Sequence, residues 1–107
     1  MSNEELIQQL SFVEQNLSSI VNQKQTYKKQ IIEMQSALKE LNNSESAYEI
    51  VGTIMIKKSS EEIIKSLNEK IESQEIRVKS LEKQEETLRK QAQEIQTKVV
   101  NDLENKN

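Results

Sequence analysis

The middle of the chain is occupied by the stretch Ala47-Tyr48-Glu49-Ile50-Val51-Gly52-Thr53-Ile54-Met55-Ile56-Lys57. Its β-branched and aromatic residues favour strands, and a two-residue loop that begins with glycine is typical of a type II′ hairpin turn. We therefore predict two antiparallel strands joined at Gly52-Thr53, with Val51 opposite Ile54 and Ile50 opposite Met55. Because strand side chains alternate between two faces, Glu49, Val51, Ile54 and Ile56 share one face, and Tyr48, Ile50, Met55 and Lys57 share the other.

This hairpin is largely apolar on both faces, and its two edges have no neighbouring strand. A two-stranded hairpin is only marginally stable in water, and open edges and apolar faces favour pairing with other chains. We therefore predict that residues 44–58 form an assembly segment, in which strands of several subunits join by strand addition. In the alternative interpretation, the hairpin folds back onto the helices of its own chain, which cover only one of its faces.

Residues 2–41 carry the pattern of a coiled-coil helix. Apolar residues recur at alternating steps of three and four, with a lysine in one position, and this spacing forms one continuous heptad seam. The seam positions are Leu6, Leu10, Val13, Leu17, Ile20, Lys24, Tyr27, Ile31, Met34, Leu38 and Leu41. Ser2 and Glu5 form a capping box at the start. Asn42-Asn43-Ser44 supplies a stop, because asparagine tolerates the left-handed conformation that follows many helices.

Residues 60–104 carry a second seam with the same alternation of three and four. Its positions are Ile64, Leu67, Ile71, Gln74, Val78, Leu81, Glu85, Leu88, Ala92, Ile95 and Val99. Ser59 and Glu62 form a second capping box. The flanking positions are mostly glutamate, lysine, glutamine and serine, as on the solvent side of a paired helix.

The two seams have matching lengths, and the hairpin between them predicts that they pair in opposite directions. With Leu41 opposite Ile64 beside the bend, every seam residue meets a seam residue, as far as Leu6 opposite Val99. The sequence therefore predicts an all-α dominated fold, in which a long antiparallel two-helix coiled coil carries a short β-hairpin at its bend. In this interpretation residues 1–107 form a single domain.

Three layers of the predicted seam contain a polar residue. They are Ile31–Gln74, Lys24–Leu81 and Ile20–Glu85. The last two layers are neighbours, so Lys24 and Glu85 are placed to pair across the seam. Such a pair has two interpretations, a catalytic pair or a device that fixes the register of the helices. The second is favoured because a thin seam offers no pocket that removes a substrate from water.

The composition excludes several classes of function. The 107 residues include no His and no Cys, 31% are charged, and the net charge is −3. The commonest general base and thiolate chemistry are therefore absent, and no glycine-rich phosphate loop occurs. We predict no catalytic, cofactor-binding or metal site and no enzyme activity. Without a basic patch, a membrane-length apolar run or a signal pattern, we expect no nucleic-acid or membrane binding and a cytoplasmic location.

Apolar residues outside the seams gather toward the end that is farthest from the hairpin. They are Ile7, Phe12, Val100 and Leu103, and the seam residues Leu6, Leu10, Ile95 and Val99 lie at the same end. Because helix ends fray, we predict that these eight residues bind unfolded proteins. In the alternative interpretation they complete the coiled coil or touch neighbouring subunits, as Val21, Ile32 and Ile76 lie off the seam elsewhere.

The order of these features resembles the β-type subunit of prefoldin. The resemblance is most specific in Tyr48–Lys57 with Gly52 in the turn, and it extends to Asn22–Tyr27 and to Arg77–Gln91, which includes Leu81-Glu82-Lys83-Gln84-Glu85-Glu86. It covers nearly the whole chain. One hairpin, rather than two, indicates the β-type and not the α-type subunit.

The resemblance implies an ATP-independent chaperone without a cofactor. Two α-type and four β-type subunits would form a hexamer whose hairpins assemble into an inter-subunit β-barrel. That platform would be built by Tyr48, Ile50, Val51, Gly52, Ile54, Met55 and Ile56. The far ends of the coiled coils would capture non-native proteins and deliver them to a group II chaperonin. The rival interpretation is a coiled-coil tether or scaffold subunit without client-holding activity.

Overall fold

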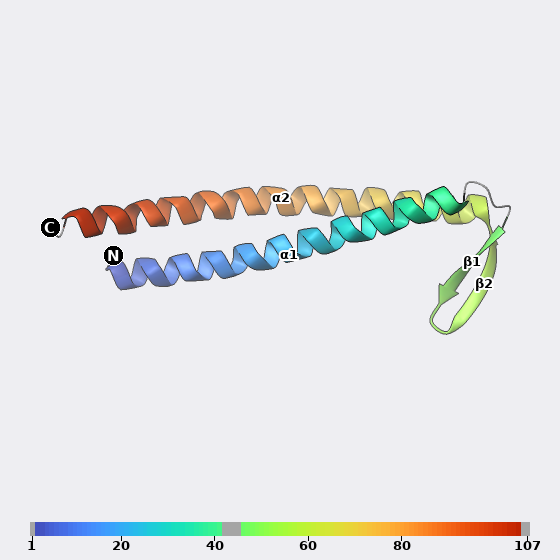
Figure 1. The fold of residues 1–107 in the computed structure, drawn as a ribbon, viewed down its shortest axis with the longest axis horizontal. Coiled ribbons are helices and arrows are strands. Elements are labelled where there is room, and N and C mark those ends of the chain that lie inside the picture. The colour runs from blue at the N-terminus through green and yellow to red at the C-terminus, as the bar shows by residue number, and fades with distance from the viewer. Residues whose placement is uncertain (1, 42–45, 106–107) are drawn as a thin grey trace. The chain divides into compact units, whose positions relative to one another are not determined.

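The computed structural model describes residues 2–41 and 46–105 of the chain. Its elements follow the order α1 (Asn3–Leu41), β1 (Ser46–Val51), β2 (Ile54–Ser59) and α2 (Ser60–Asn105). Figure 1 shows the two long helices with the two short strands between them in the sequence. This architecture confirms the predicted all-α dominated fold with one β-hairpin between the helices.

Both predicted helix starts are capped by a serine. The hydroxyl oxygen of Ser2 accepts a hydrogen bond from the backbone N–H of Glu5 at 3.2 Å, and that of Ser59 accepts one from Glu62 at 3.4 Å. Each bond satisfies an amide that has no partner within its helix. The helix α1 is described as far as Leu41, and the predicted stop at Asn42-Asn43-Ser44 lies outside the described residues.

The contacts divide the chain into two compact units. The first, here called the terminal unit, consists of Met1–Gln25 and Lys79–Asn107, and the second, the hairpin unit, consists of Thr26–Val78. Each unit holds one segment of α1 and one segment of α2. The single domain over residues 1–107 stays a prediction.

The helix segments pair in opposite directions within each unit. In the hairpin unit, Gln74 donates a hydrogen bond to Gln30 at 2.9 Å, and Arg77 donates one to Tyr27 at 3.3 Å. The later residue of α2 thus contacts the earlier residue of α1, as in an antiparallel pair. In the terminal unit, one groove is lined from α1 by Asn16, Ser19 and Ile20 and from α2 by Lys83, Gln84, Thr87 and Leu88. This pairing direction agrees with the predicted seam.

The burial pattern confirms the seam positions. Every predicted seam position is buried or half-buried, whereas nearly all the positions between them are exposed. In the hairpin unit, Ile31, Ile71 and Val78 form a buried cluster at 7–9% exposure, and Tyr27, Met34 and Leu38 pack against it. The core is therefore a narrow stripe, as expected for two helices that cover only one face of each other.

The strands pair in the predicted register. Val51 is opposite Ile54 and Ile50 is opposite Met55, and the pairing continues to Ser46 opposite Ser59. Gly52 has a φ angle of 62°, while no described residue other than glycine has a positive φ. A positive φ at the first loop residue alone defines a type II′ turn, so the predicted turn type is confirmed.

Candidate functional site

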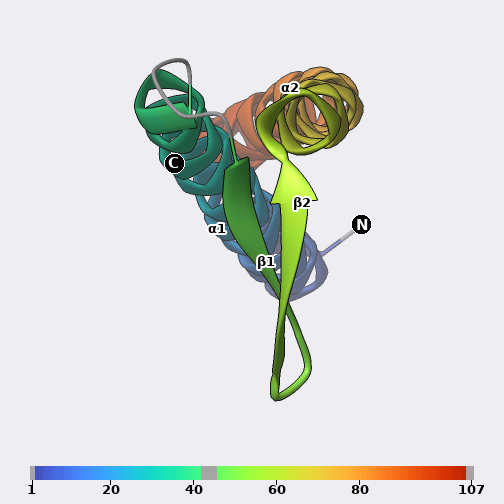
Figure 2. The same cartoon turned by 90° about the vertical axis from the view of Figure 1, so that its right-hand side faces the viewer.

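The largest uncovered apolar surface lies on the hairpin. Six side chains are 40–70% exposed, and they occupy both faces: Tyr48, Ile50, Val51, Ile54, Met55 and Ile56. Figure 2 shows the two strands as a ribbon that projects to one side of the neighbouring helix ends, with its turn at the far end. These side chains therefore keep 40% or more of their surface uncovered in the single chain, and their role in assembly stays a prediction.

An ion pair lies on one face of the hairpin, at the end near the helices. Lys58 Nζ lies 2.7 Å from Glu49 Oε2. The hydrogen bond and the positive charge of Lys58 lower the pKa of Glu49, and the same hydrogen bond and the charge of Glu49 raise the pKa of Lys58. Ala47 beside this pair is half-buried. The face thus has a polar end near the helices and an apolar end near the turn.

A second group of exposed apolar side chains belongs to the terminal unit. Ile7 and Leu103 are each 53% exposed, Phe12 is 65% exposed and Val100 is 50% exposed. We call these four residues the helix-end set, because they lie near the start of α1 and the end of α2. Their exposure agrees with the expectation for off-seam positions. Their role in binding stays a prediction.

The seam residues of the same region are covered. Leu6 is 4% exposed, and Leu10, Ile95 and Val99 are half-buried. The helices α1 and α2 continue through all four residues. The helix pair must therefore open before these side chains can meet a partner, whereas the helix-end set is accessible without such opening.

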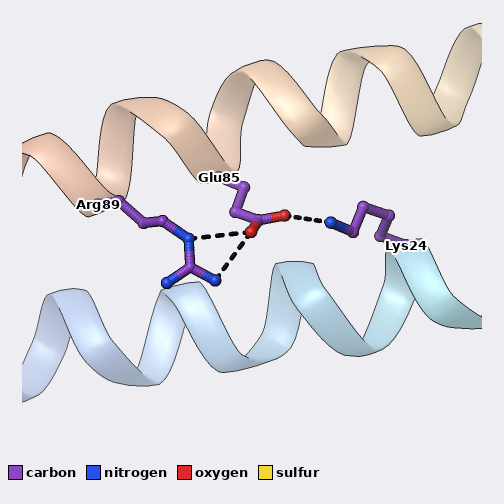
Figure 3. A network of polar contacts seen from close by, with 3 residues as sticks. All are labelled: Lys24, Glu85 and Arg89. Atoms are coloured by element: carbon purple, nitrogen blue, oxygen red, sulfur yellow. Dashed lines mark hydrogen bonds and ion pairs between the residues drawn. The ribbon is translucent and has the colours of Figure 1, made fainter.

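The polar pair predicted for the seam forms a cluster of three residues. Lys24 Nζ lies 2.5 Å from Glu85 Oε1, and their side chains are 17% and 14% exposed. Arg89 adds an ion pair to Glu85 Oε2 at 2.8 Å, as Figure 3 shows. Hydrogen bonds from Lys24 and Arg89, together with their charges, lower the pKa of Glu85.

Arg89 was not anticipated from the sequence. It lies four residues after Glu85 and therefore projects from the same side of α2, which is the signal that would have indicated it. The contact of Arg77 with Tyr27 was not anticipated either. The guanidinium carbon of Arg77 on α2 lies 5.6 Å from the centroid of the Tyr27 ring on α1. This distance fits a cation–π interaction.

Within residues 2–41 and 46–105, no three acidic side chains gather closely enough to hold a metal ion. Neither described helix is long and apolar enough to span a membrane. The candidate site consists of the exposed apolar residues of the hairpin and of the helix-end set.

Comparisons with known proteins agree with this geometry. The family model described as "Prefoldin subunit" matches residues 4–106. The crystal structure of the prefoldin beta subunit from Thermococcus strain KS-1 matches with a TM-score of 0.86 at 30% sequence identity, and the match covers 94% of this chain and 91% of that one. None of the curated proteins matches the sequence.

Proposed function

The chain belongs to the prefoldin family, and we propose that it captures non-native proteins without ATP and delivers them to a group II chaperonin. Family membership and the match to a prefoldin beta subunit support a chaperone-type subunit that assembles with other prefoldin subunits. They also point to a subunit without enzymatic activity. We propose further that this activity takes place in the cytoplasm.

The distribution of uncovered apolar side chains carries the proposal. Of the large apolar side chains that are exposed among the described residues, six lie on the hairpin, four form the helix-end set, and only Ile32 and Ile76 lie elsewhere. Exposed apolar patches commonly mark interaction sites. Two separate patches support two separate interactions, one that builds the complex and one that holds the client.

The hairpin is proposed to build the complex. Strand addition pairs the open edges of β1 and β2 with strands of other subunits, and a closed barrel of such strands leaves no edge and buries one face inside. We propose a hexamer of two α-type and four β-type subunits, held together by Tyr48, Ile50, Val51, Gly52, Ile54, Met55 and Ile56. The apolar half of the hairpin near the turn supplies the buried surface.

The helix-end set is proposed to hold the client, together with Leu6, Leu10, Ile95 and Val99 when the helix ends open. Apolar contact is non-directional, so it suits a partner without a fixed shape. Each contact is weak, but several subunits that engage one client at the same time raise its effective concentration near each of them. This arrangement needs no nucleotide, because opening and closing of helix ends is thermal.

The decisive experiment removes the helix-end set. Ile7→Ser, Phe12→Ser, Val100→Ser and Leu103→Ser are combined in one chain, which is then mixed with an α-type prefoldin subunit. We expect native mass spectrometry to show an unchanged complex, because the hairpin is intact. We expect that suppression of aggregation of a chemically denatured protein is lost. Unaltered suppression would refute client binding at these residues.

A matched control tests whether position matters or only the loss of apolar surface. The pair Ile32→Ser and Ile76→Ser removes two side chains that are each 62% exposed, which is close to Phe12 and Leu103 at 65% and 53%. The control pair should retain suppression, whereas the pair Phe12→Ser and Leu103→Ser should weaken it. A tether or scaffold subunit, the rival function, would suppress no aggregation even with its native sequence.

A further inference from the structure

The terminal unit contains a charged cluster inside an otherwise apolar seam. Lys24 and Glu85 occupy seam positions, and the neighbouring seam residue Leu81 is 8% exposed. Ile20 and Leu88, the seam residues on the other side of the cluster, are half-buried. The proposed functions of the hairpin and of the helix-end set use none of the three charged residues.

Both oxygens of the Glu85 carboxylate are engaged. Oε1 accepts a hydrogen bond from Lys24 Nζ at 2.5 Å, and Oε2 accepts one from Arg89 Nε at 3.0 Å. Figure 3 shows Lys24 and Arg89 on opposite sides of the carboxylate, with Lys24 reaching from α1 and Arg89 from α2 itself. The carboxylate is therefore paired across the helices and also along its own helix.

Such a cluster contributes more to the choice between structures than to stability. Replacing both members of a buried ion pair with apolar residues is often neutral or stabilising, but leaving one member without its partner is strongly destabilising. An arrangement of the helices that separates Lys24 from Glu85 leaves Lys24 half-buried without this partner and is therefore disfavoured. The arrangement that joins them is selected, even where its net stability is unremarkable.

Heptad seams need this kind of selection, because sliding one helix by seven residues superimposes seam on seam again. After such a slide in one direction, Lys24 faces Leu88 and Ala92. The same slide separates Glu85 from Lys24, so each charge loses its partner across the helices. All other seam residues of the terminal unit are aliphatic and exchange partners at little cost, so in this unit the charges are what distinguish the slid arrangement from the native one.

We propose that the Lys24–Glu85–Arg89 cluster fixes the register of the helix pair in the terminal unit. Its consequence concerns the helix-end set, which needs residues of α1 and α2 at the same level. A slide of seven residues moves one helix by about 10 Å along the other. In the slide that brings Asp102 opposite Leu10, Val100 moves from the level of Glu5 to that of Phe12, so the helix-end set is arranged differently. The cluster is a positioning device and does not itself contact a client.

The test uses cysteine pairs, since the native chain contains no cysteine that would interfere. Leu10→Cys with Ile95→Cys reports the native register. Leu10→Cys with Asp102→Cys reports a slide in one direction. Both pairs are placed in the full native chain and in the full chain with Lys24→Leu and Glu85→Leu, and disulfide formation within one chain is followed by mass after mild oxidation.

The native chain should form only the Leu10–Ile95 cross-link. In the variant with Lys24→Leu and Glu85→Leu, we expect the Leu10–Asp102 cross-link to rise at least about tenfold, while thermal unfolding shows that the helices remain formed. A tenfold change corresponds to a free-energy difference of about 1.4 kcal/mol between registers. If this variant forms only the native cross-link, the proposal is wrong.

Two further variants separate register from general effects. Lys24→Arg keeps the charge and should keep the native cross-link alone. Gln74→Leu removes a polar residue from the seam of the hairpin unit, where its amide donates to Gln30, and it should also leave the native cross-link unchanged. If Gln74→Leu raises the Leu10–Asp102 cross-link as much as loss of the charged pair does, seam polarity in general fixes the register and the proposed role of the cluster is refuted.

Discussion

The apolar seams of the helices and the apolar faces of the hairpin differ in how far they are exposed to solvent. Along α1 and α2, every seam position is buried or half-buried by the partner helix of the same chain. On β1 and β2, Ile50 is 70% exposed, Met55 is 65% exposed and Ile54 is 62% exposed. The same types of side chain are thus covered in one region and left open in the other.

The difference follows from the geometry of the two elements. A helix places its seam residues on one stripe, so a single partner helix covers that stripe. A strand places alternate side chains on opposite faces, so a hairpin that is apolar on both faces needs a layer on each side. Two helices from the same chain do not supply two layers. The seams of the helices are therefore covered within one chain, and the faces of the hairpin are not.

The largest effect is expected when the hairpin loses its apolar faces. Ile50→Thr and Ile54→Thr change one residue on each face and keep β-branched side chains, which favour strands. Because both residues are exposed in the single chain, its thermal unfolding should change little. Assembly with an α-type prefoldin subunit should be lost, as measured by native mass spectrometry.

The matched control for this experiment is the pair Ile32→Thr and Ile76→Thr. These two side chains are each 62% exposed and lie on the helices of the hairpin unit. They should leave the mass of the complex unaltered. A complex that forms normally despite Ile50→Thr and Ile54→Thr would show that the open faces of the hairpin are not where subunits meet.

A smaller effect is expected on the stability of the single chain, where truncation of a seam residue should cost more than truncation of a hairpin residue. Ile71 belongs to the buried cluster of the hairpin unit and is 8% exposed. Truncation of a buried isoleucine to alanine typically costs about 2–5 kcal/mol, and a two-helix seam belongs near the lower bound because it can partly collapse. Ile50→Ala, at an exposed site, should cost less than about 0.5 kcal/mol. Urea unfolding of the two variants measures the difference, and equal losses would contradict it.

The sequence was sufficient for the seams and for the hairpin turn. Alternating steps of three and four fix which residues face the partner helix, and Gly52 fixes the turn type because only glycine accepts its φ angle readily. The pairing of Lys24 with Glu85 followed from the same register. These features depend on local spacing, which a sequence displays directly.

Residue spacing does not determine two other features, the length of β2 and the direction of the Arg89 side chain. The strand β2 continues to Ser59, beyond the predicted end at Lys57, and this extension places Lys58 on the face of Glu49 and creates their ion pair. Period-two alternation assigns residues to faces, but it does not say how far each face is shielded. The recruitment of Arg89 likewise depends on the rotamer that its side chain adopts, since other directions are open to an arginine on the same face.

The smallest expected effect is on how stability changes as the pH falls, and it compares two carboxylates of α2, Glu85 and Glu86. The pKa of Glu85 is lowered from its ordinary value of 4.5 by Lys24 and Arg89. A carboxylate whose folded pKa is lowered stabilises the fold fully above its unfolded pKa, and this stabilisation is lost as the pH falls through the folded pKa. The native chain should therefore lose stability on acidification below about pH 4.5 more steeply than the variant Glu85→Gln.

Glu86→Gln provides the matched control, since its ion pair with Lys90 at 3.3 Å is about 70% exposed on both sides. Exposed pairs of this kind contribute little, so this variant should keep the acid dependence of the native chain. Thermal unfolding followed by circular dichroism at a series of pH values measures both slopes. Parallel curves for the native chain and Glu85→Gln would contradict this prediction. They would mean that the ion pairs of Glu85 contribute no more to the free energy of unfolding than an exposed pair does.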